Sequence, residues 1–203
     1  MGERAERRAL LSIGEYLNHH GGLDNFLGPQ DDGTVPLPWA GLRAHIPGLK
    51  PGQVVVIAAR PGMGKSAVAA QLAVYAAQAG KGVAVFSFEM SSGEIWRRMI
   101  AHCGGLSLGR LNHGSLAGQD RRDAHSALSQ LDAMPLWIDD STGCTVQAMT
   151  AALRKHRNAG KPLDLIVVDY LQLMQAPRRR EKRVEEITEI SRKLKLAARD
   201  LAV

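Results

Sequence analysis

Apolar residues along this chain follow two patterns that alternate from about residue 54 onward. Short, almost continuously apolar runs occupy residues 54–58, 83–88, 136–139 and 165–169. Continuous apolar runs of this length, rich in β-branched residues, predict strands that are buried on both faces. Longer stretches with an apolar residue at every third or fourth position lie between them and predict helices. The alternation predicts an α/β fold, with a mostly parallel sheet and helices on both faces.

The predicted helices of this region cover residues 66–79, 91–103, 145–158 and 181–201, with two short helices within 106–131. Ser91 or Ser92 is expected to cap the helix over 91–103, with Glu94 in its first turn, and Thr145 or a neighbour is expected to cap the helix over 145–158. The last helix has a regular apolar face, formed by Val184, Ile187, Ile190, Leu194, Ala197 and Leu201.

The first 38 residues differ from the rest of the chain. Residues 3–20 have the apolar spacing of an amphipathic helix, with Leu10, Ile13 and Leu17 on one face, and residues 23–38 are rich in Gly, Pro and Asp. We therefore expect a linker helix and loop over residues 1–38 and one α/β domain over residues 39–203. The apolar face of the linker helix can pack on its own domain or on a neighbouring subunit, and the sequence leaves both open.

Composition narrows the class of protein. The chain has 203 residues, of which 45% are hydrophobic and 23% charged, a net charge of +6 and a pI of about 9.6. These values are typical of a globular domain with a mild preference for polyanionic partners. Two isolated cysteines, Cys103 and Cys144, predict neither a disulfide framework nor a zinc site. No apolar run reaches the ~20 residues of a membrane span, and the charged N-terminus is unlike a signal peptide. We expect a cytoplasmic protein.

The stretch from residue 54 to residue 66 reads as a strand, a glycine-rich turn and the start of a helix. This order is typical of a loop that binds the phosphates of a nucleoside triphosphate. Gly62 and Gly64 allow backbone N–H groups to surround a phosphate, Lys65 adds a mobile positive charge, and the Ser66 hydroxyl is a suitable ligand for Mg²⁺. The strict pattern has Gly where this chain has Ala59, and an ordinary turn before a helix is the alternative. The predicted nucleotide-binding residues are Arg60, Pro61, Gly62, Met63, Gly64, Lys65, Ser66 and Ala67.

Acidic residues follow three of the predicted strands. Asp169 ends one strand and can support Mg²⁺ at the carboxyl edge of the sheet, or cap a turn there. Glu89 ends another and can activate the attacking water, or help to cap the next helix; position alone does not decide between these roles. Asp139 and Asp140 are expected to have structural roles in a turn and a cap.

Five positive charges and one negative charge lie within residues 178–183. Such a block is usually solvated, but cations at the start of a helix are unfavourable unless a phosphate backbone lies beside them. The candidate nucleic-acid-binding residues are Arg178, Arg179, Arg180, Lys182 and Arg183.

Taken together, these segments resemble the C-terminal motor domain of the DnaB-type replicative DNA helicases, members of the RecA-like P-loop ATPases. The resemblance rests on residues 58–66 (AARPGMGKS), 86–91 (FSFEMS), 165–174 (LIVVDYLQLM) and 186–197 (EITEISRKLKLA). An alanine in place of the first glycine is normal in that family. The resemblance implies that Lys65 and Ser66 bind ATP and Mg²⁺, that Glu89 activates water, and that Asp169 supports the metal. It also implies that the basic block lies near single-stranded DNA and that the N-terminal helix packs on the adjacent subunit of a hexameric ring.

The resemblance also implies segments that these residues do not match. After the last helix the family continues into a strand with a polar sensor and then to an arginine finger, so the sheet is expected to be incomplete at the C-terminus. Two functions therefore remain open. The first is an ATP-hydrolysing helicase motor that moves along single-stranded DNA, with weak activity as an isolated chain. The second is a non-catalytic nucleotide-binding module that joins or regulates a ring of full-length helicase subunits.

Overall fold

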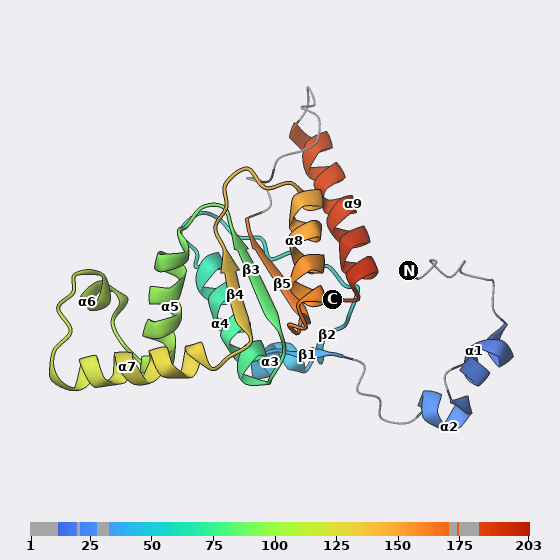
Figure 1. Cartoon of the computed structure of the whole chain (residues 1–203), viewed down its shortest axis with the longest axis horizontal. Helices are drawn as coiled ribbons and strands as arrows, with labels where there is room; N and C mark the ends of the chain where they lie inside the picture. Colours follow the sequence, from blue (N-terminus) through green and yellow to red (C-terminus); the bar gives the residue numbers. More distant parts are fainter. Residues whose placement is uncertain (1–11, 20, 28–32, 171–173, 175–182) are drawn as a thin grey trace. The chain divides into compact units, whose positions relative to one another are not determined.

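The computed structural model describes residues 12–19, 21–27, 33–170, 174 and 183–203 (Figure 1). The chain divides into two compact units, Met1–Asp32 and Gly33–Val203. Within the described part of the first unit there are two short helices, α1 (Ile13–His19) and α2 (Gly22–Leu27). No helix among the described residues combines the length and the apolarity that crossing a membrane requires.

The second unit alternates strands and helices. Its described elements are β1 (Val35–Pro36), α3 (Ala40–Arg43), β2 (Gly48–Leu49), α4 (Lys65–Gln78), β3 (Val83–Ser87), α5 (Ser92–Gly104), α6 (Leu108–Asn112), α7 (Gly118–Asp132), β4 (Leu136–Asp139), α8 (Val146–Asn158), β5 (Leu165–Asp169) and α9 (Arg183–Leu201). The two predicted caps are confirmed. Ser91 and Glu94 form a reciprocal capping box at the start of α5, and the Thr145 hydroxyl accepts a hydrogen bond from the Ala148 N–H at the start of α8.

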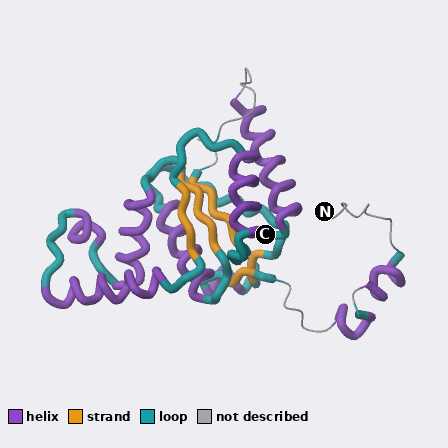
Figure 2. Tube along the Cα trace, in the orientation of Figure 1, coloured by secondary structure: helices purple, strands orange, loops and turns teal. Residues whose placement is uncertain are grey.

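Three parallel strands form the main sheet, in the order β4-β3-β5 (Figure 2). In its register, Val83 lies between Leu136 and Leu165, and at the other end Ser87 lies beside Asp169. The carboxyl ends of β3 and β5 therefore meet at the same edge. The parallel arrangement follows from the connections, because each strand is followed by a helical crossover before the next.

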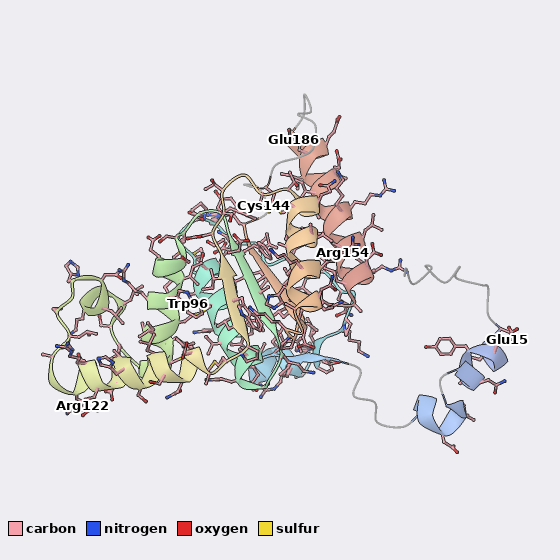
Figure 3. The ribbon with its side chains drawn as sticks, viewed as in Figure 1. Glu15, Trp96, Arg122, Cys144, Arg154 and Glu186 are labelled. Atoms are coloured by element: carbon pink, nitrogen blue, oxygen red, sulfur yellow. The ribbon has the colours of Figure 1, made fainter. Side chains whose placement is uncertain are left out.

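Helices cover both faces of this sheet, as the sequence predicts (Figure 1). Val83 and Val85 face a core that includes buried residues of α4, α5 and α7. Ala84 and Phe86 face a second core built with residues of α8 and α9, against which Cys144 also packs (Figure 3). Every residue of the central strand β3 is buried. The continuous apolar pattern of this strand is explained by the two covered faces.

A substitution at Met149 tests the packing of the second core, formed with α8 and α9. Its side chain is 1% exposed, so Met149→Ala is expected to lower the free energy of unfolding by about 2–5 kcal/mol, because the lost contacts leave a cavity. Met63, 71% exposed, is the matched control, and Met63→Ala should change stability by no more than about 0.5 kcal/mol. Urea unfolding of both variants measures the difference. Equal losses would show that Met149 is not a core residue.

The predicted strand over residues 54–58 is wrong. Residues 53–60 have no regular secondary structure, and Val54, Val55, Val56 and Ile57 are 38–75% exposed. The β-branched residues favour an extended backbone, but a strand exists only when a neighbour accepts and donates its ladder hydrogen bonds. No described residue forms such a ladder with this segment, so it forms no strand.

Of the helix expected over residues 3–20, residues 13–19 are helical, and Ser12 and Glu15 form a reciprocal cap before them; positions 3–11 and 20 lie outside the described residues. Two other predictions need correction. The stretch expected to be a linker contains α2 and β1. Both elements are short, and the Gly and Pro residues around them hid their patterns in the sequence. Val184, placed on the buried face of the last helix, is 74% exposed, since the packing of α9 begins one turn later.

His156 gives stability a dependence on pH. It packs edge-on against Trp137 with 4.2 Å between ring centroids, and its Nε2 atom is buried without a hydrogen-bond partner among the described residues. Burial, aided by the charge of Lys161, lowers the pKa of His156 against the opposing effect of a hydrogen bond with the Pro162 backbone. His156 therefore binds a proton more readily in the unfolded chain than in the folded protein. The free energy of unfolding should decrease as the pH falls below about 6.5, the ordinary pKa of histidine.

Thermal unfolding between pH 7.5 and pH 5 measures this effect. His156→Phe keeps the edge-on ring contact and removes the titrating group, so its melting temperature should decrease less over this range than that of the unmodified chain. His125, exposed on α7, provides the control, because His125→Gln should retain the original pH dependence. Parallel pH profiles for the unmodified chain and His156→Phe would contradict the assignment.

Candidate nucleotide site

The loop before α4 has the conformation expected of a phosphate-binding turn. Gly62 and Gly64 adopt φ values of +79° and +86°, which side chains rarely adopt, and a Cβ built at either position would meet no atom within 4 Å. Gly64 is also the N-cap of α4, and no side chain caps this end of the helix. The free N–H groups and the helix dipole therefore form an anion-binding surface at the start of α4.

Lys65 and Ser66 begin this helix. The Lys65 ammonium group donates a hydrogen bond of 3.3 Å to the carbonyl oxygen of Ala59, so the side chain lies back over the loop. That contact is long and partly exposed, and a phosphate oxygen is a stronger partner for the ammonium group than a carbonyl oxygen. The Lys65 side chain is thus placed where it can exchange the Ala59 contact for a bound phosphate.

Ser66 and Asp169 line one small pocket. The other lining residues come from α4, β3, α5 and the turn between the last two: Ala69, Ala70, Val85, Met90, Ile95, Arg98 and Met99. Ser66 and Asp169 are far apart in the sequence, and the fold brings them together because β5 is parallel to β3 and ends beside α4. The hydroxyl and the carboxylate are the kind of oxygen donors that Mg²⁺ prefers.

Glu89 lies at the same edge of the sheet but does not line this pocket. The Ser87 hydroxyl donates to the Met90 carbonyl oxygen at 2.8 Å and accepts from the Met90 N–H at 3.2 Å, closing a turn that leaves Glu89 exposed. The backbone N–H of Phe88 donates to the carbonyl oxygen of Asp169 at 2.8 Å, which joins the two strand ends. Glu89 therefore lies one residue beyond the junction of β3 and β5, with its carboxylate in solvent.

The structural roles predicted for Asp139 and Asp140 are confirmed. Asp139 accepts a hydrogen bond from the Ser141 N–H at 2.9 Å, and Asp140 accepts one from the Ser92 N–H at 2.7 Å. The latter contact lowers the pKa of Asp140 and ties the start of α5 to the end of β4. It holds α5, with Arg98 in its second turn, against the pocket.

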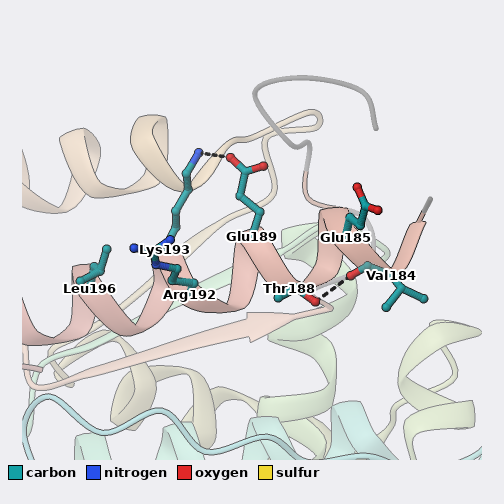
Figure 4. Close-up of a pocket in the computed structure, with 7 residues that line it drawn as sticks. All are labelled: Val184, Glu185, Thr188, Glu189, Arg192, Lys193 and Leu196. Atoms are coloured by element: carbon teal, nitrogen blue, oxygen red, sulfur yellow. Dashed lines mark hydrogen bonds and ion pairs between the residues drawn. The ribbon is translucent and has the colours of Figure 1, made fainter. Parts of the chain in front are cut away.

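The structure does not test the candidate nucleic-acid-binding residues. Arg178, Arg179, Arg180 and Lys182 lie outside the described residues, and Arg183 is described only as the first residue of α9. A second hollow runs along α9 and is lined by Val184, Glu185, Thr188, Glu189, Arg192, Lys193 and Leu196 (Figure 4). It contains an ion pair of 2.8 Å between Lys193 and Glu189. Because no residue of the loop before α4 lines it, it is separate from the nucleotide site.

The family of DnaB-like helicase C-terminal domains matches residues 35–203, which include the loop, the pocket and both covered faces of the sheet. The chain belongs to this family. Its relatives include replicative DNA helicases DnaB of Buchnera aphidicola subsp. Schizaphis graminum, 36% identical over 181 residues, and of Nostoc sp., 37% identical over 171 residues. The matched parts cover 88% and 83% of this chain but 39% and 19% of those proteins, so the chain spans well under half of their lengths.

Solved structures related to this DnaB-like domain have the same fold. One is an ATPase domain that matches with a TM-score of 0.78 and 28% identity, over 85% of this chain and 63% of the solved chain. A DnaB-like replicative helicase, studied with its interactions with primase, matches with the same score and identity over 83% of this chain and 41% of that protein. The RecA-like fold predicted from the sequence is confirmed, although in this DnaB-like domain residues 54–58 form no strand.

The pocket of this DnaB-like domain fits a magnesium ion held by few protein groups. No cluster of three or more His, Cys, Asp or Glu side chains suited to a metal occurs among the residues with described positions. Mg²⁺ does not need one, because it keeps several waters and is usually bound by one or two protein oxygens together with substrate phosphates. Ser66 and Asp169 provide such a pair.

Sequence reasoning missed Arg98, the one basic residue in the described part of the chain that lines the pocket. Its helical position was the available signal. Ile95 and Met99 are buried one turn apart on α5, and Arg98 lies on the helix surface between them, at the border of the buried face. A long charged side chain at that border can extend toward α4, the neighbouring helix that also lines the pocket.

Proposed function

We propose that this chain is the ATP-binding motor domain of a DnaB-like helicase, in which ATP hydrolysis drives movement along single-stranded DNA and unwinding of the duplex during replication. The observation that carries the proposal is the pocket shared by Ser66 and Asp169 beside the uncapped start of α4. A hydroxyl, a carboxylate and free helix N–H groups at one sheet edge are the set of groups that a magnesium-bound triphosphate requires.

Each candidate residue has a distinct part in this proposal. The backbone N–H groups of residues 62 and 64–66 donate to the phosphate oxygens within the loop of residues 60–67, and Lys65 turns from Ala59 to the β- and γ-phosphates. Ser66 and the water shell at Asp169 would hold Mg²⁺, which neutralises the negative charge of the phosphates when it is bound. Glu89 acts as the base that orients and deprotonates the attacking water, a role that suits a solvent-facing carboxylate beside the site.

DNA binding and assembly are the less direct parts of the proposal. The relatives that carry the name replicative DNA helicase support single-stranded DNA as the polymer on which the domain acts, with the basic residues 178–183 as its contact. A ring of six subunits, with the N-terminal helix packed on a neighbour, fits the family. We expect weak ATP turnover by this chain alone, since an arginine from a second polypeptide is worth roughly 10³–10⁵ in kcat in comparable phosphoryl-transfer sites.

Binding of a fluorescent ATP analogue in Mg²⁺ and in EDTA tests the proposal. The chain should bind the analogue in both buffers and more tightly with Mg²⁺, and Asp169→Asn should reduce the advantage that Mg²⁺ gives. Arg154, exposed on α8, offers a control, because Arg154→Gln should bind as the unmodified chain does. Absence of binding in either buffer would reject the proposed function.

The exposed segment of residues 54–57 favours a second candidate function. Four exposed apolar side chains on a backbone without strand partners among the described residues form a surface that another polypeptide strand can cover. A non-catalytic module that joins a ring of full-length helicase subunits would use such a surface. Size-exclusion chromatography with a full-length DnaB helicase, with and without ATP, separates the candidates. ATP-dependent association with negligible turnover supports the module, whereas turnover by the chain alone supports the motor.

A further inference from the structure

Among the described residues that line the pocket, Arg98 is the one with a positively charged side chain, and the lining is otherwise apolar except for Ser66 and Asp169. It is half-buried on α5, where the bond between Ser92 and Asp140 fixes the start of the helix. A guanidinium group is expensive to remove from water without a partner. An anion that lines the same pocket would therefore be a favourable partner for this half-buried group.

Asp169 is the carboxylate that meets this need. Neither Arg98 nor Asp169 has a side-chain hydrogen bond or ion pair to another residue in the part of the chain that the structure describes. Glu94, one turn before Arg98, forms no ion pair with it among the described residues: its Oε2 atom accepts bonds of 2.9 and 2.8 Å from the Ser91 backbone and hydroxyl, and the charge of Arg98 makes only a smaller contribution to the lowered pKa of Glu94. Asp169 is the only acidic residue among the described positions that line the pocket together with Arg98.

We propose that Arg98 is a positioning residue that orients the Asp169 carboxylate for the divalent cation when nucleotide is bound. This inference rests on the proposed function. The long Arg98 side chain closes onto Asp169 by rotation within the pocket and donates to one carboxylate oxygen, leaving the other toward the cation beside Ser66. Partners of this kind fix the direction of a metal-supporting group, and their loss typically weakens metal binding by roughly 10–100-fold.

Arg98→Met is the decisive variant. Methionine has a similar length and suits the apolar lining, so the fold should be kept, as circular dichroism and thermal unfolding can check. We expect the affinity for a non-hydrolysable ATP analogue in EDTA to stay within about twofold, since Arg98 does not touch the phosphates. The affinity of the analogue-bound protein for Mn²⁺, measured by electron paramagnetic resonance, should fall about 10-fold. Arg98→Lys keeps the positive charge but lacks the planar guanidinium group, so its affinity for Mn²⁺ should fall less than that of Arg98→Met.

Two comparisons make the test specific. Arg97, exposed on the same helix, is the matched control, and Arg97→Met should leave the Mn²⁺ affinity unchanged. In the Asp169→Asn background, Arg98→Met should cause no further loss, because the group that it orients is already changed. Losses that add in the double variant, or equal Mn²⁺ affinity in Arg98→Met and Arg97→Met, would overturn the inference while leaving the proposed function intact. Failure of the unmodified chain to bind the analogue would overturn both.

Discussion

Replacing Lys65 with alanine is expected to reduce ATP turnover by roughly 10²–10³-fold, the usual cost of removing one charge-stabilising donor from an active site. The ammonium group lies over the loop, 3.3 Å from the Ala59 carbonyl oxygen, and is the cation that begins α4 beside the free helix N–H groups. Without it, the charge on the β- and γ-phosphates is less well compensated, so the affinity for ATP should also fall. A phosphate-release assay and a nucleotide titration measure the two effects.

Lys155→Ala provides the comparison. Lys155 is exposed on α8, so removing it changes the net charge by the same amount without touching the loop. We expect this variant to retain the turnover and ATP affinity of the unmodified chain. Equal turnover in the Lys65 and Lys155 variants would mean that hydrolysis does not occur at this loop.

Glu89→Gln is expected to separate ATP binding from ATP hydrolysis. If the Glu89 carboxylate deprotonates the attacking water, an amide of the same shape leaves the phosphates bound but removes the base, and kcat should fall roughly 10²–10⁴-fold. Glu89 is exposed and does not line the pocket of Ser66 and Asp169, so the dissociation constant for ATP should change little. Single-turnover kinetics and a titration of the same protein provide both values.

Glu185, exposed on α9, is the control for this change. Glu185→Gln should leave kcat unaltered. If Glu89→Gln hydrolyses ATP at the original rate, Glu89 has only the structural role that its position before α5 also allows, and another group must activate the water.

Local sequence signals predicted most of the elements of the fold. The capping residues Ser91 and Thr145 mark the starts of α5 and α8, and the runs at β4 and β5 begin and end where the sequence placed them. These features depend on interactions within a few residues, which is why a pattern can reveal them. The segment of residues 54–58 has an equally clear strand pattern but no strand, because pairing depends on a distant neighbour that propensity does not report.

In the candidate site, too, local features could be predicted from the sequence, whereas contacts between distant segments were harder to predict. The phosphate-binding loop is a contiguous motif, and the positive φ values of Gly62 and Gly64 agree with its pattern. The meeting of Ser66 and Asp169 follows from parallel strands that end at one edge, a rule that can be applied to sequence. Arg98 could not be found in this way. It reaches the pocket because α5 packs beside α4, and helix packing selects its neighbours through side-chain shape rather than through spacing along the chain.

A crystal structure of this chain with Mg²⁺ and a non-hydrolysable ATP analogue would test the shared site most directly. The account predicts the β- and γ-phosphates within hydrogen-bonding distance of the backbone N–H groups at the start of α4 and of the Lys65 ammonium group. It also predicts Mg²⁺ between the Ser66 hydroxyl and the side of the pocket formed by Asp169. A triphosphate bound elsewhere on the domain, or a cation held without either residue, would contradict it.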